Sequence, residues 1–214
     1  MAGDRPLRVG VLALQGGYAA HIAVLEGLGA RAVELRHERA LAGCDALVIP
    51  GGESTTMTRL LDDAGPGFRT ALEAYCAKKP VMGTCAGLIL LSRDAGDVRV
   101  KPFGLLPITV ERNAYGRQNE SSVRMLKLDP VLGGGGEYRA VFIRAPRIVG
   151  WDDDVAILAR EPAGHTADYQ HERNGAPVLV RYRHILGLSF HPELTPEDSR
   201  IHGYFLAMCR EGWG

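Results

Sequence analysis

Short runs rich in valine, isoleucine and leucine alternate with amphipathic stretches through the first half of the chain. Parallel strands are buried on both faces and are joined by helical crossovers, so this alternation is typical of a parallel sheet between two layers of helices. The expected strands cover residues 9–14, 32–35, 46–49 and 80–82. The expected helices cover residues 18–28, 54–62 and 68–77, and a further helix begins at residue 88.

The second half of the chain changes to strand-like segments separated by turn signals such as Asn174-Gly175. The expected strands cover residues 108–111, 122–128, 139–143, 155–160, 177–182 and 185–190. A last helix is expected over residues 196–210, with Thr195 as its N-cap and Pro196 at its first position. We therefore predict an α/β fold of three layers, with a mostly parallel central sheet, helices on both faces and added antiparallel strands in the second half.

Length and composition indicate one globular domain over residues 1–214 and exclude several classes of protein. The 25 lysines and arginines balance 25 aspartates and glutamates, which argues against a basic nucleic-acid binder. No apolar run approaches the ~18 residues of a membrane span, and residues 9–14 are too few for a secretory signal. The four cysteines show neither a C-x-x-C pair nor metal-ligand spacing, so we expect a cytoplasmic protein with free thiols and no metal.

Three polar or glycine-rich stretches are interpreted as loops. The run Gly133 to Gly136 lacks the lysine and the strand-to-helix context of a phosphate-binding loop. The acids Asp152 to Asp154 are adjacent, so they cannot all face one metal ion from a regular element, and a solvated turn is expected. The polar stretch 161–176 is expected to be a loop away from the motifs described below.

The strongest local signal is Gly83-Thr84-Cys85-Ala86-Gly87, between a short apolar strand and an apolar helix. This is the G-x-nucleophile-x-G pattern of a nucleophile elbow, in which a sharp turn strains the backbone and leaves no room for side chains on the flanking glycines. Cys85 would lie at a helix N-terminus, where a thiolate is stabilised. The alternative is an ordinary strand-turn-helix link that contains a buried cysteine.

A nucleophilic thiol needs a base, and the base needs a group that orients it. Among the seven histidines, His191 follows a strand-like run and is followed closely by Glu193. In an extended segment, residues i and i+2 point the same way, so we expect the Glu193 carboxylate to hold the ring of His191. His21 is expected near the end of the first strand and thus near the site, without acting in it.

Acyl chemistry also needs hydrogen-bond donors for the developing oxyanion. The segment Pro50 to Ser54 is a second junction from a strand to a helix, and its amides would face the same crevice as the elbow. We expect the backbone N–H groups of Gly52 and Ala86 to be these donors.

Taken together, these motifs resemble the class I, triad-type glutamine amidotransferases and, more narrowly, the family of glutaminase subunits of pyridoxal 5'-phosphate synthase. The resemblance rests on pieces that span nearly the whole chain. They are Gly10-Val-Leu-Ala-Leu-Gln-Gly16, Pro50-Gly-Gly-Glu-Ser-Thr-Thr56, Gly83-Thr-Cys-Ala-Gly87-Leu-Ile-Leu, Glu111-Arg-Asn113, Gly116-Arg-Gln118, Phe142-Ile-Arg-Ala-Pro146 and Ser189-Phe-His-Pro-Glu-Leu194.

The resemblance implies that Cys85 is the nucleophile and that His191 and Glu193 complete a triad. It also implies that glutamine is held by Gly52, Glu53, Ser54, Arg112, Ile143 and Arg144. No cofactor is implied. The implied partner is a PdxS-type synthase subunit in a large hetero-oligomer. It combines the ammonia that the glutaminase releases from glutamine with a pentose phosphate and a triose phosphate. Neither nucleic acid nor a membrane is expected as a partner. Two alternatives remain: the glutaminase of another class I amidotransferase, and a non-catalytic interaction module on the same fold.

Overall fold

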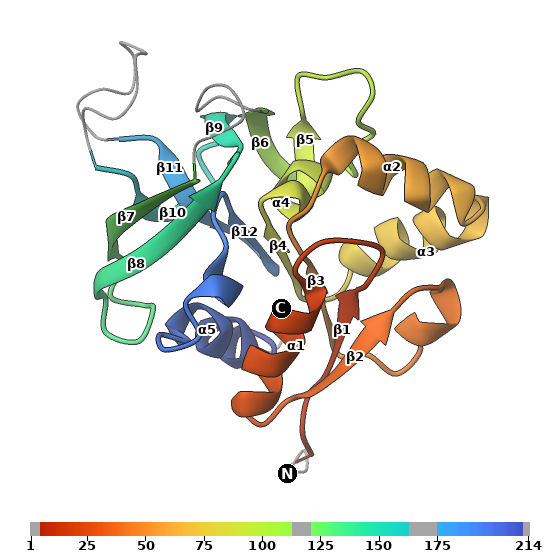
Figure 1. Cartoon of the computed structure of the whole chain (residues 1–214), viewed down its shortest axis with the longest axis horizontal. Coiled ribbons are helices and arrows are strands. Elements are labelled where there is room, and N and C mark those ends of the chain that lie inside the picture. Colours follow the sequence, from red (N-terminus) through yellow and green to blue (C-terminus); the bar gives the residue numbers. More distant parts are fainter. Residues whose placement is uncertain (1–4, 113–120, 163–174, 212–214) are drawn as a thin grey trace.

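The computed structural model describes residues 5–112, 121–162 and 175–211. At its centre, five strands pair in parallel, as the alternating apolar runs predict (Figure 1). In order across the sheet they are β2 (Arg31–Leu35), β1 (Arg8–Leu12), β3 (Ala46–Ile49), β4 (Val81–Thr84) and β12 (Ile185–Leu188). The strand β12 comes from the end of the chain, so it brings the segment that contains His191 beside the strand that leads to Cys85.

The same sheet continues beyond β12 with four antiparallel strands, which confirms that the second half of the chain adds antiparallel structure. They are β11 (Pro177–Tyr182), β10 (Ala156–Arg160), β7 (Ser121–Leu128) and β8 (Gly136–Ile143). The predicted α/β class is therefore confirmed, with a sheet whose parallel and antiparallel halves meet at β12.

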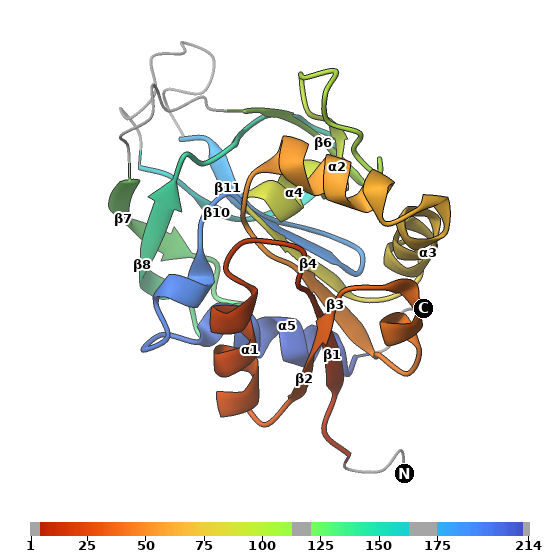
Figure 2. The same ribbon diagram turned by 45° about the vertical axis from the view of Figure 1, so that its right-hand side comes forward.

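Helices cover both faces of the parallel half (Figure 2). On one face lie α1 (Tyr18–Gly27) and α5 (Arg200–Met208), and on the other lie α2 (Ser54–Asp63), α3 (Pro66–Cys76) and α4 (Ala86–Leu91). Side chains alternate along each strand, so Val48 packs with the first layer while Leu47 and Ile49 pack with the second. The strands are apolar on both sides because each side has its own core.

A second, smaller sheet was not fully predicted. It has the order β5 (Ser92–Asp94), β6 (Leu106–Glu111) and β9 (Arg147–Trp151), and its apolar side chains join the core that contains α2, α3 and α4. Of its three strands, only the region of β6 was expected; β5 has three residues, too few for a recognisable alternation. This sheet carries Arg112, which directly follows β6, toward the carboxyl ends of the parallel strands.

The predicted start of the last helix is wrong. A short 3₁₀ helix, η2 (Pro192–Leu194), is followed by turns, and α5 begins at Arg200 with Ser199 as its N-cap. The Thr195 hydroxyl does not cap a helix, because it lies 2.7 Å from the Tyr138 hydroxyl and donates to the Pro192 carbonyl at 3.2 Å. A buried tertiary hydrogen bond thus takes the place of the predicted cap.

The expected loops are found where the structure describes them. Residues 133–135 form the turn between β7 and β8, although Gly136 already belongs to β8, and residues 152–154 form an exposed turn after β9. Most of the polar stretch 161–176, including Asn174, lies outside the described residues, as do Asn113, Gly116 and Gln118. Within residues 5–112, 121–162 and 175–211, no helix has the length and apolar character needed to cross a membrane.

Candidate active site

Cys85 occupies a strained turn between β4 and α4. Its φ is 50° and its ψ is −105°, a backbone conformation that side-chain-bearing residues rarely adopt. The flanking glycines are needed for packing: a Cβ on Gly83 would lie 2.7 Å from the carbonyl oxygen of Gly87, and one on Gly87 would lie 2.0 Å from that of Ile49. The strain and the close packing fit a nucleophile elbow better than an ordinary strand-to-helix link.

His191 and Glu193 form a buried pair. The His191 Nδ1–H group donates to Glu193 Oε1 at 2.7 Å. The pairing is as expected, but its backbone basis differs, because Glu193 lies in the 3₁₀ turn η2 and not in an extended segment. The turn brings the Glu193 carboxylate back toward the ring of His191, two residues earlier in the chain.

The electrostatic interactions of this pair favour a protonated His191 and an ionised Glu193. Burial by itself would lower the pKa of His191, but the interactions with Cys85 and Glu193 outweigh it and raise that pKa to about 10. Burial would raise the pKa of Glu193, yet its contacts with His191 and His21 hold that pKa well below the usual range of a glutamate. A cationic His191 between the Cys85 thiol and the Glu193 carboxylate can stabilise a thiolate and later donate a proton.

Gly51 lies against the side chains of both Cys85 and His191 and leaves room for them. A Cβ on Gly51 would lie 2.4 Å from His191 Cε1 and 3.2 Å from Cys85 Cβ, so both side chains pack directly against this glycine. The next residue, Gly52, has a φ of 156°, and a Cβ there would lie 3.0 Å from the Gln15 side chain. The Gln15 amide in turn donates to the Glu53 carbonyl and holds this turn from β1's side.

A cavity of about 220 Å³ opens in front of Cys85. It is lined by Gly52, Glu53, Ser54, Cys85, Ile89, Arg112, Ile143, Arg144 and His191. The structure therefore brings together the predicted nucleophile, its histidine and all six residues that were expected to hold glutamine. Glu193 lies behind His191 and outside this lining, and Ala86, which follows Cys85 as the first residue of α4, is buried. The oxyanion role of the Gly52 and Ala86 amides stays a prediction.

Charged and polar groups line the cavity beside Cys85, as the binding of a zwitterion requires. The Ser54 hydroxyl oxygen is buried and has no hydrogen-bond partner among residues 5–112, 121–162 and 175–211. The Cys85 thiol faces the Ile143 carbonyl at 3.8 Å, where β8 ends. Arg144 follows with a φ of 44°, a left-handed conformation that turns the chain at the mouth of the cavity.

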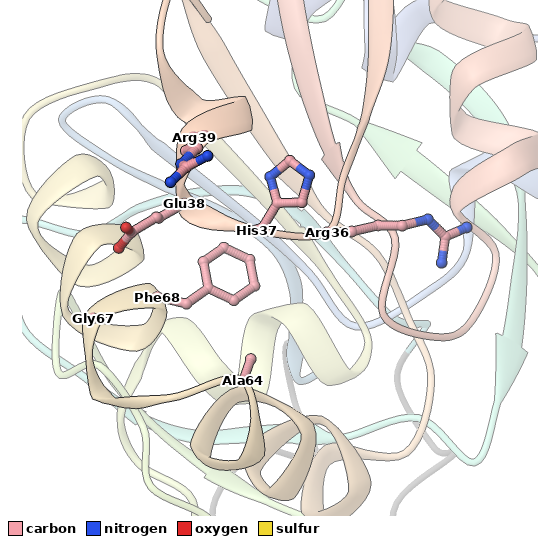
Figure 3. A pocket seen from close by; sticks show the side chains of 7 residues that line it. All are labelled: Arg36, His37, Glu38, Arg39, Ala64, Gly67 and Phe68. Atoms are coloured by element: carbon pink, nitrogen blue, oxygen red, sulfur yellow. The ribbon is translucent and has the colours of Figure 1, made fainter.

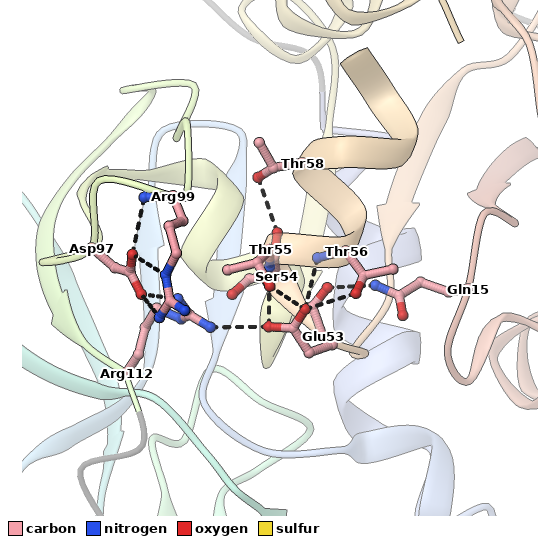
Figure 4. Close-up of polar contacts among 9 residues, drawn as sticks. All are labelled: Gln15, Glu53, Ser54, Thr55, Thr56, Thr58, Asp97, Arg99 and Arg112. Carbon is pink, nitrogen blue, oxygen red and sulfur yellow. Dashed lines mark hydrogen bonds and ion pairs between the residues drawn. The ribbon is translucent and has the colours of Figure 1, made fainter. Parts of the chain in front are cut away.

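Glu53 and Arg112 belong to one hydrogen-bonded network (Figure 4). The Glu53 carboxylate caps α2 by accepting from the backbone N–H groups of Thr55 at 3.1 Å and Thr56 at 2.7 Å. Burial would raise the pKa of Glu53, but these hydrogen bonds and those of the two hydroxyls lower it to about 2. Arg112 lies 3.0 Å from Glu53 and also pairs with Asp97. The arginine is thus held between two carboxylates.

A larger cavity, of about 590 Å³, lies elsewhere, between the 3₁₀ helix η1 (Glu38–Leu41) and the start of α3 (Figure 3). It is lined by Arg36, His37, Glu38, Arg39, Ala64, Gly67 and Phe68. Its lining among the described residues includes neither a cysteine nor any other residue expected in the site, and Arg36 is already paired with Glu34. The smaller cavity is therefore the candidate active site.

Sequence reasoning missed several residues of this region. Ile89 lies one helical turn after Cys85 and could have been found from the helical period. Asp97 and Gln15 act through contacts between distant segments, which no local pattern reveals. His21 was expected nearby, but its partner His202 was not.

Comparisons with known proteins agree with this geometry. The chain matches the SNO glutamine amidotransferase family over residues 11–211. It is 45% identical to the pyridoxal 5'-phosphate synthase subunit PdxT of Koribacter versatilis over 96% of this chain and 97% of that protein. The PdxT of Brevibacillus brevis is 44% identical over 96% of this chain and 98% of that protein.

Solved structures give the same result. A crystal structure of a glutamine amidotransferase is 39% identical with a TM-score of 0.79, over 94% of this chain and 98% of that one. The structure of PurLQS from Thermotoga maritima has a TM-score of 0.65 over 95% of this chain and 98% of that one. At 17% sequence identity, this similarity concerns the fold alone.

Proposed function

The chain belongs to the SNO glutamine amidotransferase family, and from this premise we propose that it is the glutaminase subunit of a pyridoxal 5'-phosphate synthase. It hydrolyses L-glutamine to L-glutamate and ammonia, and residues 1–214 form a single glutaminase domain. One observation carries the proposal: Cys85 and His191 line the same cavity as two arginines and a glutamate, and Glu193 binds the far side of the His191 ring.

The reaction has two stages. The Cys85 thiolate attacks the side-chain carboxamide carbon of glutamine, and the amides of Gly52 and Ala86 hold the oxyanion. The His191 imidazolium protonates the departing nitrogen, and ammonia leaves as the C–N bond breaks. Water then gives a proton to the now neutral His191 and attacks the thioester, which releases glutamate and restores the thiolate. Glu193 keeps the His191 ring oriented throughout.

The cavity supplies partners for both charges of the amino acid. A substrate carboxylate needs N–H donors and an ammonium needs acceptors, and Arg112, Arg144 and Glu53 all line the cavity. Ser54 offers a buried hydroxyl that has no hydrogen-bond partner among the residues that the structure describes. Ile143 contributes its backbone carbonyl next to the thiol.

Ammonia released into bulk water would be protonated and diluted, so its use requires a protein that receives it directly. The relatives named above are subunits of pyridoxal 5'-phosphate synthase. We place this chain with a PdxS-type synthase subunit in a large cytoplasmic hetero-oligomer that builds pyridoxal 5'-phosphate from ribose 5-phosphate and glyceraldehyde 3-phosphate. The glutaminase itself needs no cofactor.

The test is glutamate release from glutamine, measured with and without the synthase subunit. We expect turnover that rises when the synthase subunit is present and that is abolished in Cys85→Ala and Cys85→Ser. The control Cys209→Ser changes a thiol outside the cavity and should keep the activity. Normal turnover in either Cys85 variant would overturn the proposed nucleophile. Activation only by a synthase for another product would assign the chain to a different amidotransferase, and failure of every synthase to elicit turnover would favour a non-catalytic module.

A further inference from the structure

Two histidines that the mechanism does not use lie behind Glu193. His21 comes from α1 and His202 from α5, and the side chains of both are completely buried. Burial of an imidazole costs free energy unless its nitrogen atoms find partners. A pair of buried histidines next to the carboxylate of a proposed triad therefore needs an explanation.

The contacts continue from the triad in one line. His191 binds Glu193 Oε1, and the other carboxylate oxygen, Oε2, lies 3.2 Å from His21 Nε2. On the other side of the ring, His21 Nδ1 lies 2.9 Å from His202 Nε2. The Thr84 hydroxyl, next to Cys85 in the sequence, lies 3.4 Å from His21 Nε2.

The start of α1 also contacts this carboxylate. A Cβ on Gly17, the N-cap of α1, would lie 2.9 Å from Glu193 Oε1. Gly17 therefore lies so close to Glu193 that a side chain at this position would clash with the carboxylate. His21 lies one turn further along the same helix. The positive end of the helix dipole favours an ionised carboxylate at this position.

One placement of the protons is consistent with these contacts. Because Glu193 is an ionised acceptor, the nitrogen that faces it must carry a proton, which places one on His21 Nε2. When the His21 ring carries this one proton, its Nδ1 is an acceptor and His202 donates through Nε2–H. His202 Nδ1 is buried and has no hydrogen-bond partner within residues 5–112, 121–162 and 175–211. A bare lone pair there costs less than an unpaired N–H group, in keeping with a His202 pKa that burial and then His21 lower to about 3.

We propose that His21 is a positioning residue of the glutaminase, which holds Glu193 through its Nε2–H group, and that His202 fixes the tautomer in which it can do so. Glu193 Oε2 has no hydrogen bond of good geometry among residues 5–112, 121–162 and 175–211, so the His21 ring at 3.2 Å is the polar contact that keeps Glu193 in place to orient His191. This inference rests on the proposed function, since it extends the same triad into the core between α1 and α5.

Two matched variants separate the contact with Glu193 from the burial of a polar side chain. In His21→Gln, the side-chain amide nitrogen takes the place of Nε2 and still faces Glu193. In His21→Asn, the amide takes the place of Nδ1, so contact with His202 is kept and the donor to Glu193 is lost. A hydrogen bond to a buried charge corresponds to about a ten-fold to 100-fold effect. We therefore expect kcat to fall by about that factor in His21→Asn and to be largely restored in His21→Gln.

The KM for glutamine should change little in both variants, because His21 does not line the cavity. His37→Gln makes the same chemical change at an exposed position and should match the wild type. Each variant is measured in the complex with the synthase subunit after its thermal unfolding has been recorded. Equal kcat values for His21→Asn and His21→Gln, whether high or low, would overturn the positioning role.

A spectroscopic readout tests the tautomers without glutaminase activity. Long-range ¹H–¹⁵N spectra of the histidine rings of the full chain, at neutral pH, should show His21 and His202 as neutral rings protonated at Nε2, with assignments from His21→Gln and His202→Gln. A His21 ring that is protonated at Nδ1 would contradict the inference. Because this result does not depend on turnover, an inactive wild-type complex would refute the proposed function while leaving the tautomers to be judged separately.

Discussion

A single methyl group on Gly51 tests whether His191 must lie where the structure places it. The Cβ of Gly51→Ala would lie 2.4 Å from His191 Cε1 and 3.0 Å from its Nδ1. Carbon atoms in contact are ordinarily about 3.5 Å apart or more. Either the ring or the turn that contains Gly51 must therefore move by about 1 Å.

That displacement acts on both neighbours of the ring. The same Cβ would lie 3.2 Å from Cys85 Cβ, so the turn cannot relax toward Cys85, and movement of the ring away from the added methyl group disturbs its 2.7 Å hydrogen bond to Glu193. A misplacement of about 1 Å among reacting groups can cost about 100-fold in rate. We expect kcat of Gly51→Ala to fall by about this factor, together with a loss of about 1–3 kcal/mol in the free energy of unfolding from overpacking.

The assay is steady-state glutamate release by the complex, with urea unfolding to measure stability. The control is Gly203→Ala in the middle of α5, where a Cβ would meet nothing within 4 Å. It should keep full activity and gain about 0.5–1 kcal/mol of stability, because alanine is the better helix former. A folded Gly51→Ala protein with the kcat of the wild type would refute the claim that His191 is positioned against this glycine.

Three further changes probe the cavity and the elbow. The pKa of Glu53 is lowered from 4.5 to about 2, so its carboxylate stabilises the fold above a pH of about 4.5 and loses that effect as the pH falls through about 2. The loss of unfolding free energy in Glu53→Gln should accordingly shrink between about pH 6 and pH 3 in urea titrations; an undiminished loss would contradict the capping role. Arg112→Met should raise the KM for glutamine at least about ten-fold, because it removes a charge-assisted contact; an unchanged KM would argue against a contact with substrate. Gly87→Ala, whose Cβ would lie 2.0 Å from the Ile49 carbonyl oxygen, should lower the melting temperature and the soluble yield, and a wild-type melting curve would contradict the packing of the elbow.

Local patterns were enough to predict the features that depend on a few adjacent residues. Apolar runs such as 46–49 are read directly as buried parallel strands, and the elbow around Cys85 has a motif because its strain requires glycines at fixed positions. The pairing of His191 with Glu193 was predicted because the two residues are close in the sequence, even though a 3₁₀ turn and not a strand brings them together.

Features that depend on distant segments could not be predicted from one sequence. Thr195 looks like a helix cap until its contact with Tyr138 is known, and α5 begins four residues later than a cap there would place it. Asp97 and His202 carry no motif, because their effect depends on where the small sheet and the last helix pack. In each case a tertiary contact decides what a locally ambiguous polar side chain does.

The central claim is that glutamine is attacked by the Cys85 thiolate in the cavity that His191 shares. The most direct measurement uses a glutamine analogue with a diazoketone in place of its carboxamide, followed by intact-mass and peptide analysis of the complex. The account predicts one adduct per chain, on Cys85, which excess glutamine prevents. No adduct with the synthase subunit present, or an adduct on Cys44, Cys76 or Cys209 instead, would contradict it.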